Sequence, residues 1–285
     1  MPPRTLDIHP HIITTDTVKY PRDPLGGTQS TWSRDRPTTY AQLIAAMDEA
    51  NVPKAAIVQA STCYGFDNSY VADAVAAHPE RFTGVFSVDV LAPDAAERIR
   101  YWVGKGLTGL RLFTTGSTMP GQATWIDDPN TFPAWKRCAD LGIPVCMQMQ
   151  QSAIPQLKTL IGRFPTVTII IDHLMRPPIE DGPPYASAEP MLALSKHANI
   201  CLKLTSVILR DANKGKATPE SFFRKVVGEY GASRIAWGSN FPASEGSLKE
   251  IVEESRAALS FLSAGELESI FWGTAQKLYP ALAER

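Results

Sequence analysis

The 285-residue sequence lacks a surplus of charge of either sign and lacks any long apolar run. Its 28 Lys and Arg residues balance 29 Asp and Glu residues, so the formal net charge is −1. A chain without a basic excess has no field that would neutralise a nucleic-acid backbone or an anionic membrane surface. The best apolar stretch, Val167–Ile171, includes a threonine and falls far short of the about 20 residues of a membrane helix. We therefore expect neither nucleic acid nor a membrane as a partner.

Cysteine is also scarce, and no CxxC pair is present. The four cysteines are widely spaced, and three of them lie in apolar runs, where a free thiol packs as a small hydrophobic group. We expect all four to be reduced and structural: Cys63, Cys138, Cys146 and Cys201. The N-terminal residues show no apolar segment of the kind found in secretory signals, so we expect a cytoplasmic protein.

Hydrophobic residues make up 44% of the chain, which is enough for a large core. Short β-branched runs alternate with longer helical segments. Eight runs have the character of strands, namely Thr5–His9, Ala55–Ala60, Thr83–Val88, Gly109–Phe113, Pro144–Met149, Val167–His173, Asn199–Thr205 and Arg234–Ser239. Helical patterns lie between them at Thr39–Asn51, Asp67–Ala77, Ala92–Lys105, Thr131–Leu141, Ser152–Arg163, Ala186–His197 and Pro219–Tyr230.

Repeated β–α units in a chain of this length predict a (β/α)8 TIM-type barrel, formed by residues 1–285 as a single domain. Two ordinary domains would also fit the length. A doubly wound open sheet would alternate in the same way, but no GxGxxG follows the first run. Because barrel enzymes carry their reactive groups at the carboxyl ends of the strands, we look for site residues there.

Histidines end two of the predicted strands. His9 and His11 are two residues apart, and the period of an extended chain places both on the same side. Two imidazoles so spaced can bind one ion or flank one substrate group. His173 ends the run Val167–His173. The alternatives are that one of the first pair is a solvated loop residue and that His173 is a core histidine with a satisfied partner.

Arginines and an amide are predicted at the same mouth of the barrel. Arg111, Arg176 and Arg210 would converge there, and a forked guanidinium suits a carboxylate, so we expect an anionic substrate. Each arginine alone is more often a member of a surface ion pair. Gln148 belongs to the predicted strand Pro144–Met149 and would face the same mouth.

The segment 176–190 contains too many prolines for a helix and is long for a loop between a strand and a helix. We expect it to form a lid over the site. Tyr185 is the side chain expected to reach the ligand.

Together these residues form a set of motifs that resembles the amidohydrolase superfamily. The resemblance is to the branch that includes 2-pyrone-4,6-dicarboxylate lactonase, 4-sulfomuconolactone hydrolase and L-fuconolactonase, and it covers nearly the whole chain. The motifs are Asp7-x-His9-x-His11, Gly109-x-Arg111, Asp172-His173-x-x-Arg176-Pro177, Lys203-Leu204 with the later Arg210, Gly238-Ser239-Asn240-Phe241-Pro242 and Ile270-Phe271-Trp272-Gly273-Thr274-Ala275.

The resemblance implies that His9, His11 and His173 are catalytic or bind a metal. It also implies that the three arginines grip acidic groups of the substrate. A binuclear centre is not expected, because the predicted strand Gly109–Phe113 offers no Lys for a carbamate bridge and Gln148 stands near the place where two-metal relatives have a His. Two alternatives stay open: the site binds one Zn²⁺ or another divalent ion, or it binds no metal.

Asn240 departs from the superfamily pattern, which has an Asp base at that place. An amide cannot accept a proton near neutral pH. Three explanations are open: the branch tolerates Asn and uses His173 as the base, the residue is an engineered replacement of Asp, or the site has lost its activity.

The function that the resemblance implies is hydrolysis of a small, carboxylated lactone by attack of water on the ring ester. The partner is then a small anionic lactone, with His9, His11, His173 and Asn240 in the catalytic site. A metal-dependent decarboxylase of the same superfamily and a non-catalytic ligand-binding barrel are the alternatives. The oligomeric state is open, with a homo-oligomer among the options.

Overall fold

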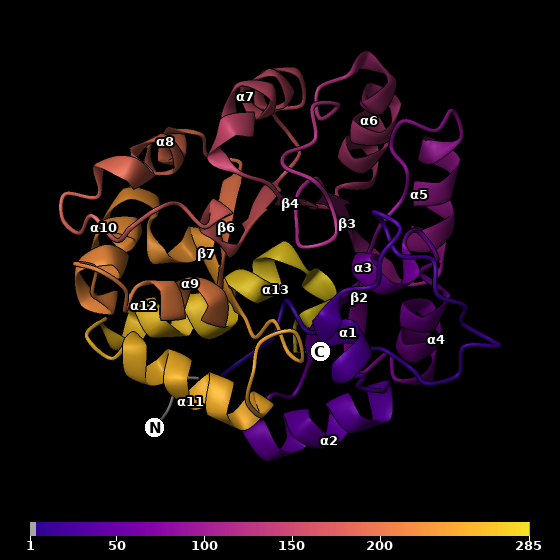
Figure 1. Ribbon diagram of the computed structural model, residues 1–285, viewed down its shortest axis with the longest axis horizontal. Helices are drawn as coiled ribbons and strands as arrows, with labels where there is room; N and C mark the ends of the chain where they lie inside the picture. Colours follow the sequence, from indigo (N-terminus) through magenta and orange to yellow (C-terminus); the bar gives the residue numbers. More distant parts are fainter. Residues whose placement is uncertain (1–3, 285) are drawn as a thin grey trace.

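A computed structural model describes residues 4–284 and contains a curled parallel sheet of seven strands in the order β1 to β7 (Figure 1). The strands are β1 (Ala55–Val58), β2 (Phe82–Phe86), β3 (Leu107–Phe113), β4 (Val145–Gln148), β5 (Ile169–Asp172), β6 (Ile200–Thr205) and β7 (Ile235–Gly238). Each strand pairs in parallel with the next along the chain. Seven of the eight predicted strands are confirmed by these pairings.

The first predicted strand, Thr5–His9, is wrong as a regular strand. The segment makes one bridge, Asp7 with Ala55, beside β1, while on its other side the Ile8 N–H donates to the Trp237 carbonyl of β7 at 3.3 Å. It therefore lies between the two outer strands and closes the ring. Regular pairing stops because the His9 N–H donates to the Asp7 carboxylate and the next residue is a proline, which has no N–H.

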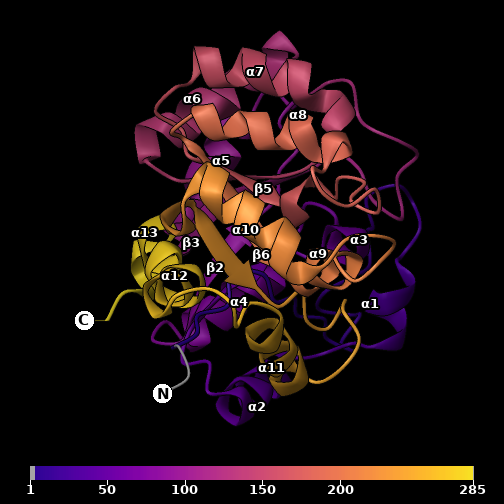
Figure 2. The ribbon, with the colours of Figure 1, turned by 90° about the vertical axis from the view of Figure 1, so that its left-hand side faces the viewer.

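The helices surround the sheet and confirm the barrel (Figures 1 and 2). They are α1 (Thr31–Asp35), α2 (Tyr40–Ala50), α3 (Ser61–Tyr64), α4 (Ser69–Ala77), α5 (Ala95–Gly104), α6 (Phe132–Leu141), α7 (Ile154–Arg163), α8 (Glu189–Leu192), α9 (Ser206–Asp211), α10 (Pro219–Tyr230), α11 (Leu248–Ala258), α12 (Ala264–Glu268) and α13 (Thr274–Leu278). The views agree that α2 and α11 lie side by side, so the ring of helices closes where the sheet does.

Six of the predicted helices correspond to α2, α4, α5, α6, α7 and α10. The seventh, Ala186–His197, is wrong as one helix, because the structure has short 3₁₀ turns on either side of the four-residue α8. The sequence prediction missed α11, which begins with a capping box between Ser247 and Glu250.

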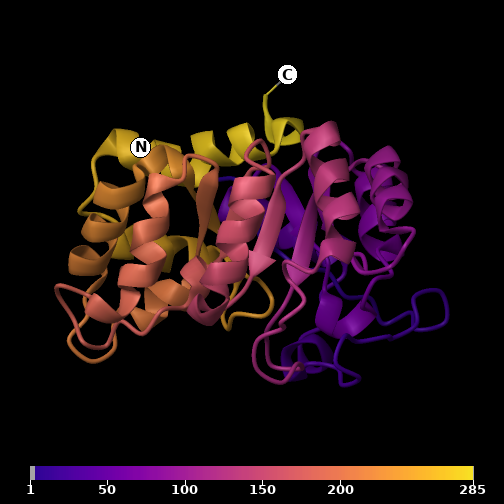
Figure 3. The ribbon, with the colours of Figure 1, turned by 90° about the horizontal axis from the view of Figure 1, so that it is seen from above.

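A residue near the C-terminus fills part of the barrel interior, at the end opposite the carboxyl ends of the strands. Tyr279, which directly follows α13, is buried there, and its hydroxyl lies 3.2 Å from the Cys146 sulfur of β4. Figure 3 shows both chain ends on this side of the barrel, opposite the longer loops. All four cysteines are buried and free, as predicted. Within residues 4–284 no helix is both long and apolar enough to span a bilayer.

Candidate active site

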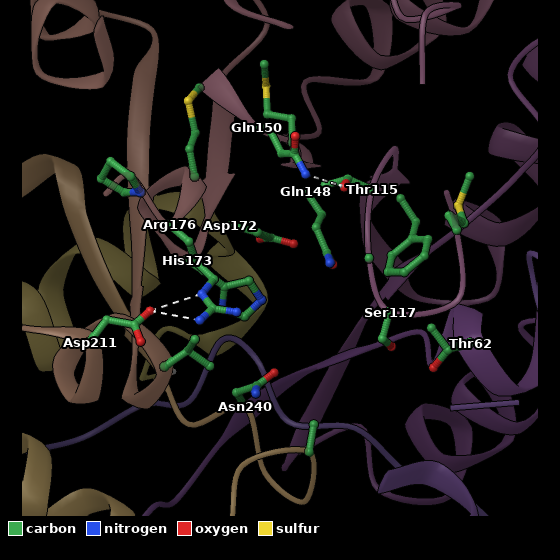
Figure 4. Close-up of a pocket in the computed structure, with 18 of the residues that line it drawn as sticks. Thr62, Thr115, Ser117, Gln148, Gln150, Asp172, His173, Arg176, Asp211 and Asn240 are labelled. Atoms are coloured by element: carbon green, nitrogen blue, oxygen red, sulfur yellow. Dashed lines mark hydrogen bonds and ion pairs between the residues drawn. The ribbon is translucent and has the colours of Figure 1, made fainter. Parts of the chain in front are cut away.

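The carboxyl ends of the strands open into a cavity of about 990 Å³ (Figure 4). A volume of this order accommodates a small organic molecule. Six of the predicted site residues line it: His11, Arg111, Gln148, His173, Arg176 and Asn240. Pro177, Pro178 and Glu180 from the predicted lid segment line it as well.

The three predicted histidines form one cluster. The ring centre of His9 lies 5.0 Å from that of His11 and 4.8 Å from that of His173. All three are buried, and His9 lies below the other two, outside the set of residues that line the cavity. The fold therefore brings His9 and His173, which are 164 residues apart in the sequence, into one cluster.

His11 has a defined tautomer. Its Nδ1 lies 2.8 Å from the Val58 carbonyl oxygen, which can only accept a hydrogen bond. The proton of neutral His11 is therefore on Nδ1, and Nε2 carries a lone pair. Burial, reinforced by the Arg111 charge, lowers the pKa of His11 to about 3, so the ring is neutral near pH 7.

His173 has a less restrictive partner, because the Thr205 hydroxyl, 2.7 Å from Nδ1, can donate or accept. Burial lowers the pKa of His173 to about 4, although the Asp172 charge opposes the shift. The backbone around this histidine is unusual, since four consecutive residues, from His173 to Arg176, have φ between 45° and 60°. Left-handed backbone at non-glycine residues is costly and is concentrated at functional sites.

His9 is the most enclosed of the three. Its side chain is fully buried, and neither ring nitrogen has a hydrogen-bond partner. The Asp172 carboxylate lies nearby, with its Oδ1 3.8 Å from Nδ1. Burial and the Lys203 charge lower the pKa of His9 well below its ordinary value. The whole cluster is therefore uncharged at neutral pH.

A buried group of charges lies under the histidines. Asp172, at the end of β5, pairs with Lys203 Nζ at 2.8 Å through Oδ1 and with Arg111 Nε at 2.9 Å through Oδ2. Burial alone would raise the pKa of Asp172, but the two cations outweigh it and hold the carboxyl ionised. Two cations therefore share the Asp172 carboxylate beneath the cavity.

The sequence analysis did not select Lys203 as a site residue. Its side chain is fully buried in β6, where every neighbour along the strand is also buried. The signal was present, because a lysine inside the run Ile-Cys-Leu-Lys-Leu cannot be a solvated residue if that run is a central strand. Asp172 was seen only as part of a motif.

Arg111 and Arg176 line the cavity but are already paired. Besides Asp172, Arg111 donates to Gln148 Oε1 through Nη2. Arg176 donates to Asp211 through Nε at 3.0 Å, and Lys214 Nζ lies 2.6 Å from the same carboxylate. Arg176 and Lys214 are largely exposed, so two cations share the carboxylate of Asp211 at the rim.

Arg210 and Tyr185 do not line the cavity, contrary to the sequence prediction. Arg210 faces α11 and pairs with Glu254, because the face of α9 that meets the cavity is the one carrying Val207 and Asp211. Tyr185 is buried against α10, where its hydroxyl pairs with Ser221. Both side chains therefore connect neighbouring elements of the barrel and do not face the cavity.

Asn240 lies at the edge of the cavity in left-handed backbone, with φ of 59° (Figure 4). Asn is one of the few residues that adopt this conformation readily. Its Nδ2 donates to Ser244 Oγ at 2.9 Å. That bond leaves Oδ1, which is a hydrogen-bond acceptor, for a ligand or a water molecule.

The donor groups as placed do not fit a divalent metal ion. Within residues 4–284 no group of three or more His, Cys, Asp or Glu side chains has the spacing to hold one. The histidines are neutral, and Asp172 beside them is already matched by Lys203 and Arg111. A divalent ion there would be repelled by the charges of Lys203 and Arg111.

A parallel barrel with histidines and a buried ion-pair group at its carboxyl edge has the architecture of barrel enzymes. The chain belongs to the amidohydrolase family, whose profile matches residues 6–281. The resemblance inferred from the motifs is thereby confirmed.

Three relatives illustrate the family. An L-fucono-1,5-lactonase from Burkholderia ambifaria is 31% identical over 121 residues, so the match spans 42% of this chain and 42% of that relative. The structure of a candidate 2-pyrone-4,6-dicarboxylic acid hydrolase from Pseudomonas putida has a TM-score of 0.79 at 21% identity and covers 100% of both chains. An amidohydrolase from Burkholderia multivorans, crystallised with zinc bound, has a TM-score of 0.75 at 18% identity, covering 97% of this chain and 99% of that one.

Proposed function

We propose that the protein is a hydrolase that opens a small lactone by attack of water on the ring ester. The observation that carries this proposal is the hydrogen bond from His11 Nδ1 to the Val58 carbonyl, which leaves the lone pair of Nε2 as a proton acceptor in the cavity wall. The match to an L-fucono-1,5-lactonase supports the same substrate class.

His11 takes the proton of the attacking water in this proposal. Water places one hydrogen on His11 Nε2 and the other on Asn240 Oδ1, so that its oxygen lone pair is directed at the carbonyl carbon. The imidazolium that forms is stabilised by the hydrogen bond from Nδ1 to the Val58 carbonyl. Asn240 thus orients the water without accepting its proton.

The negative charge on the carbonyl oxygen forms near the buried cation pair. Arg111 lines the cavity with only 4% of its surface exposed, and a buried cation acts in a medium of low dielectric. His173 can add a hydrogen bond from Nε2 when the Thr205 hydroxyl donates to Nδ1. These groups stabilise the tetrahedral intermediate without changing their own charge.

The intermediate collapses when the bond from the carbonyl carbon to the ring oxygen breaks. The leaving oxygen takes the proton from His11, so the products are an alcohol and a carboxylic acid on one open chain. The acid ionises at neutral pH, and one proton is released for each ring opened. His11 returns to its neutral form for the next cycle.

A carboxylate on the substrate, if placed at the rim, would lie against Arg176 and Lys214. Both cations pair with the carboxylate of Asp211 and are more than half exposed, so they are accessible to a ligand. We expect Arg176→Met to raise KM for a carboxylated lactone and to leave KM for its methyl ester unchanged. An equal effect on both substrates would show that the rim does not bind the carboxylate.

No step of this mechanism passes through a metal ion, since the donor set does not fit one. Elemental analysis of protein purified without chelators, with activity measured before and after EDTA, tests that reading directly. The four buried free cysteines suit a reducing compartment, and we propose a cytoplasmic location on that ground.

The sign of the proton balance separates the lactonase from a decarboxylase. Opening a lactone releases a proton near pH 7, whereas loss of CO₂ from a benzoate-type acid takes one up at the ring carbon. Initial rates in weakly buffered solution with a pH indicator should show enzyme-dependent acidification with γ- and δ-lactones. Conversion of 2,6-dihydroxybenzoate to resorcinol and CO₂, and no response to any lactone, would overturn the proposal.

A further inference from the structure

We propose that the cavity wall formed by the ends of β3 and β4 recognises ring hydroxyl groups, so that the substrate is a polyhydroxylated lactone. This inference rests on the proposed lactone hydrolysis and specifies its substrate. The wall is lined by Thr115, Ser117, Gln148 and Gln150, which lie together on one side of the cavity (Figure 4).

Arg111 has little capacity left to bind a carboxylate on this side. Its Nε donates to Asp172 and its Nη2 donates to Gln148, and the side chain is almost completely buried. A substrate carboxylate would have to compete with Asp172 for Arg111 Nε and with Gln148 for Arg111 Nη2. The recognition chemistry of this wall therefore comes from its amide and hydroxyl groups.

Gln148 presents hydrogen-bond donors to the cavity because Arg111 fixes its amide. A guanidinium is a donor only, so the atom of Gln148 that faces Arg111 has to be Oε1. The Nε2 group, with two hydrogens, is then on the opposite side of the amide and is available to a ligand. The pair makes Arg111 a positioning residue for Gln148.

Gln150 presents the opposite polarity. The Thr115 hydroxyl donates its only hydrogen to the Gly121 carbonyl at 2.8 Å, so its oxygen accepts from Gln150 Nε2 at 3.1 Å. Gln150 Oε1 is left as an acceptor. A donor on Gln148 and an acceptor on Gln150 match a hydroxyl group, which both accepts and donates, whereas a carboxylate only accepts.

Aromatic rings complete the cavity. Trp32 and Phe113 line it, and the Trp32 ring centre is 5.1 Å from that of His11. A saturated ring with hydroxyls at its edge has apolar C–H faces that pack on such rings. Amides at one side and aromatic faces at another suit a ring of this kind close to the reacting histidines.

Binding of ring amides tests recognition apart from catalysis, because a lactam keeps the ring and the carbonyl but resists hydrolysis. We expect wild-type protein to bind D-glucono-1,5-lactam at least about tenfold more tightly than 2-piperidone in isothermal titration calorimetry, as two or more net hydrogen bonds would give. Equal affinity for the two lactams would overturn the inference.

Gln148→Glu removes the donor and keeps an acceptor for Arg111, so most of that preference should be lost. Ser152→Asp is the control for the added charge, since Ser152 is exposed and lines the same cavity but is not one of the four residues of the wall. The control should keep the preference. If Gln148→Glu does not fold, Gln150→Met removes the acceptor at an exposed position and should also lower it. A preference unchanged in a folded variant would contradict the assignment.

Kinetics separate failure of this inference from failure of the proposed function. Preferential binding of the hydroxylated lactam with no hydrolysis of any lactone would support the hydroxyl wall and overturn the lactonase. Ring opening of D-glucono-1,5-lactone and δ-valerolactone with equal kcat/KM would support the lactonase and overturn the hydroxyl wall.

Discussion

At the scale of single residues, hydrogen-bond partners give the three histidines different chemistry. His11 faces a carbonyl that can only accept, His173 faces a hydroxyl that can do either, and His9 has no partner on either nitrogen. Only His11 is therefore fixed as a proton acceptor before a ligand arrives. His9 does not line the cavity, and its role is to hold the rings of His11 and His173 in place.

Replacing His173 by Ala should lower kcat by at least about a hundredfold, which is the scale of losing a transition-state hydrogen bond. Replacing His9 by Ala should have an effect of the same order, because His11 and His173 would lose the ring that they pack against. The protein should stay folded, because both side chains lie at the end of the barrel and not between its sheet and helices. Thermal unfolding followed by circular dichroism provides the control. Turnover close to wild type in either variant would exclude that residue from the mechanism.

Asn240→Asp should give no gain in kcat. The mechanism uses Asn240 to orient water, and a new carboxylate would place a negative charge near the oxygen that becomes negative in the intermediate. A gain of about a hundredfold or more would show that position 240 is the place of the base. The asparagine would then be the reason for low activity in this chain.

Acid should destabilise the protein through its buried histidines. The pKa values of about 3 for His11 and about 4 for His173 lie below the ordinary 6.5, so the unfolded chain binds more protons between about pH 4 and 6.5. The free energy of unfolding therefore rises with pH in that window and falls on acidification. Urea titrations at pH 4.5 and 5.5 measure the slope.

The matched variant for that measurement is His11→Gln, because glutamine at position 11 does not take up a proton in this pH range. Its slope should be smaller by up to about 1.4 kcal/mol per pH unit, the value for one proton. A slope equal to that of the wild type would mean that His11 is not held neutral in the folded protein.

At the scale of elements, the segment 5–9 and β7 position the histidines through a close backbone contact. A Cβ on Gly238 would lie 2.6 Å from the His9 Cβ. Asp7 ties the same two segments together, because its Oδ1 accepts from the His9 N–H at 2.9 Å and from the Ser239 N–H at 2.8 Å. The glycine of the Gly-Ser-Asn motif is thus needed to seat His9.

Gly238→Ala should destabilise the protein by about 1–3 kcal/mol, as overpacking of a core does, and should lower kcat because His9 is displaced. Gly228→Ala is the control: that glycine lies inside α10, and nothing is within 4 Å of its added Cβ. There the substitution should stabilise the helix by up to about 1 kcal/mol. Equal effects of the two substitutions in urea titrations would refute the close-contact argument.

The elements show what a sequence can and cannot reveal. The alternation of apolar runs with helical patterns predicted eight strands and seven helices, and seven of those strands and six of those helices are present. The strands were recognisable because parallel barrel strands are buried on both faces. The segment Thr5–His9 was misjudged, since it makes a single bridge beside β1, its His9 N–H bonds to the Asp7 side chain, and its Ile8 N–H bonds to β7, more than 200 residues away in the chain. No local pattern reports that partner.

At the scale of the whole molecule, the barrel brings the strand ends together and also decides which predicted residues face the cavity. His11, His173, Arg111 and Gln148 follow from their place on strands or just after them. Arg210 lies on a helix that follows β6, and its direction depends on how α9 packs against α11. Sequence spacing cannot give that rotation, and for the same reason the burial of Tyr185 against α10 was not predicted.

The mechanism depends most directly on His11 as the proton acceptor. The decisive measurement is kcat of His11→Gln for the lactone that the wild type opens fastest, from initial rates of proton release at pH 7. A fall of about a hundredfold or more in a variant that unfolds at the wild-type temperature is the predicted result. A kcat within about threefold of wild type would contradict the assignment of His11 as the base.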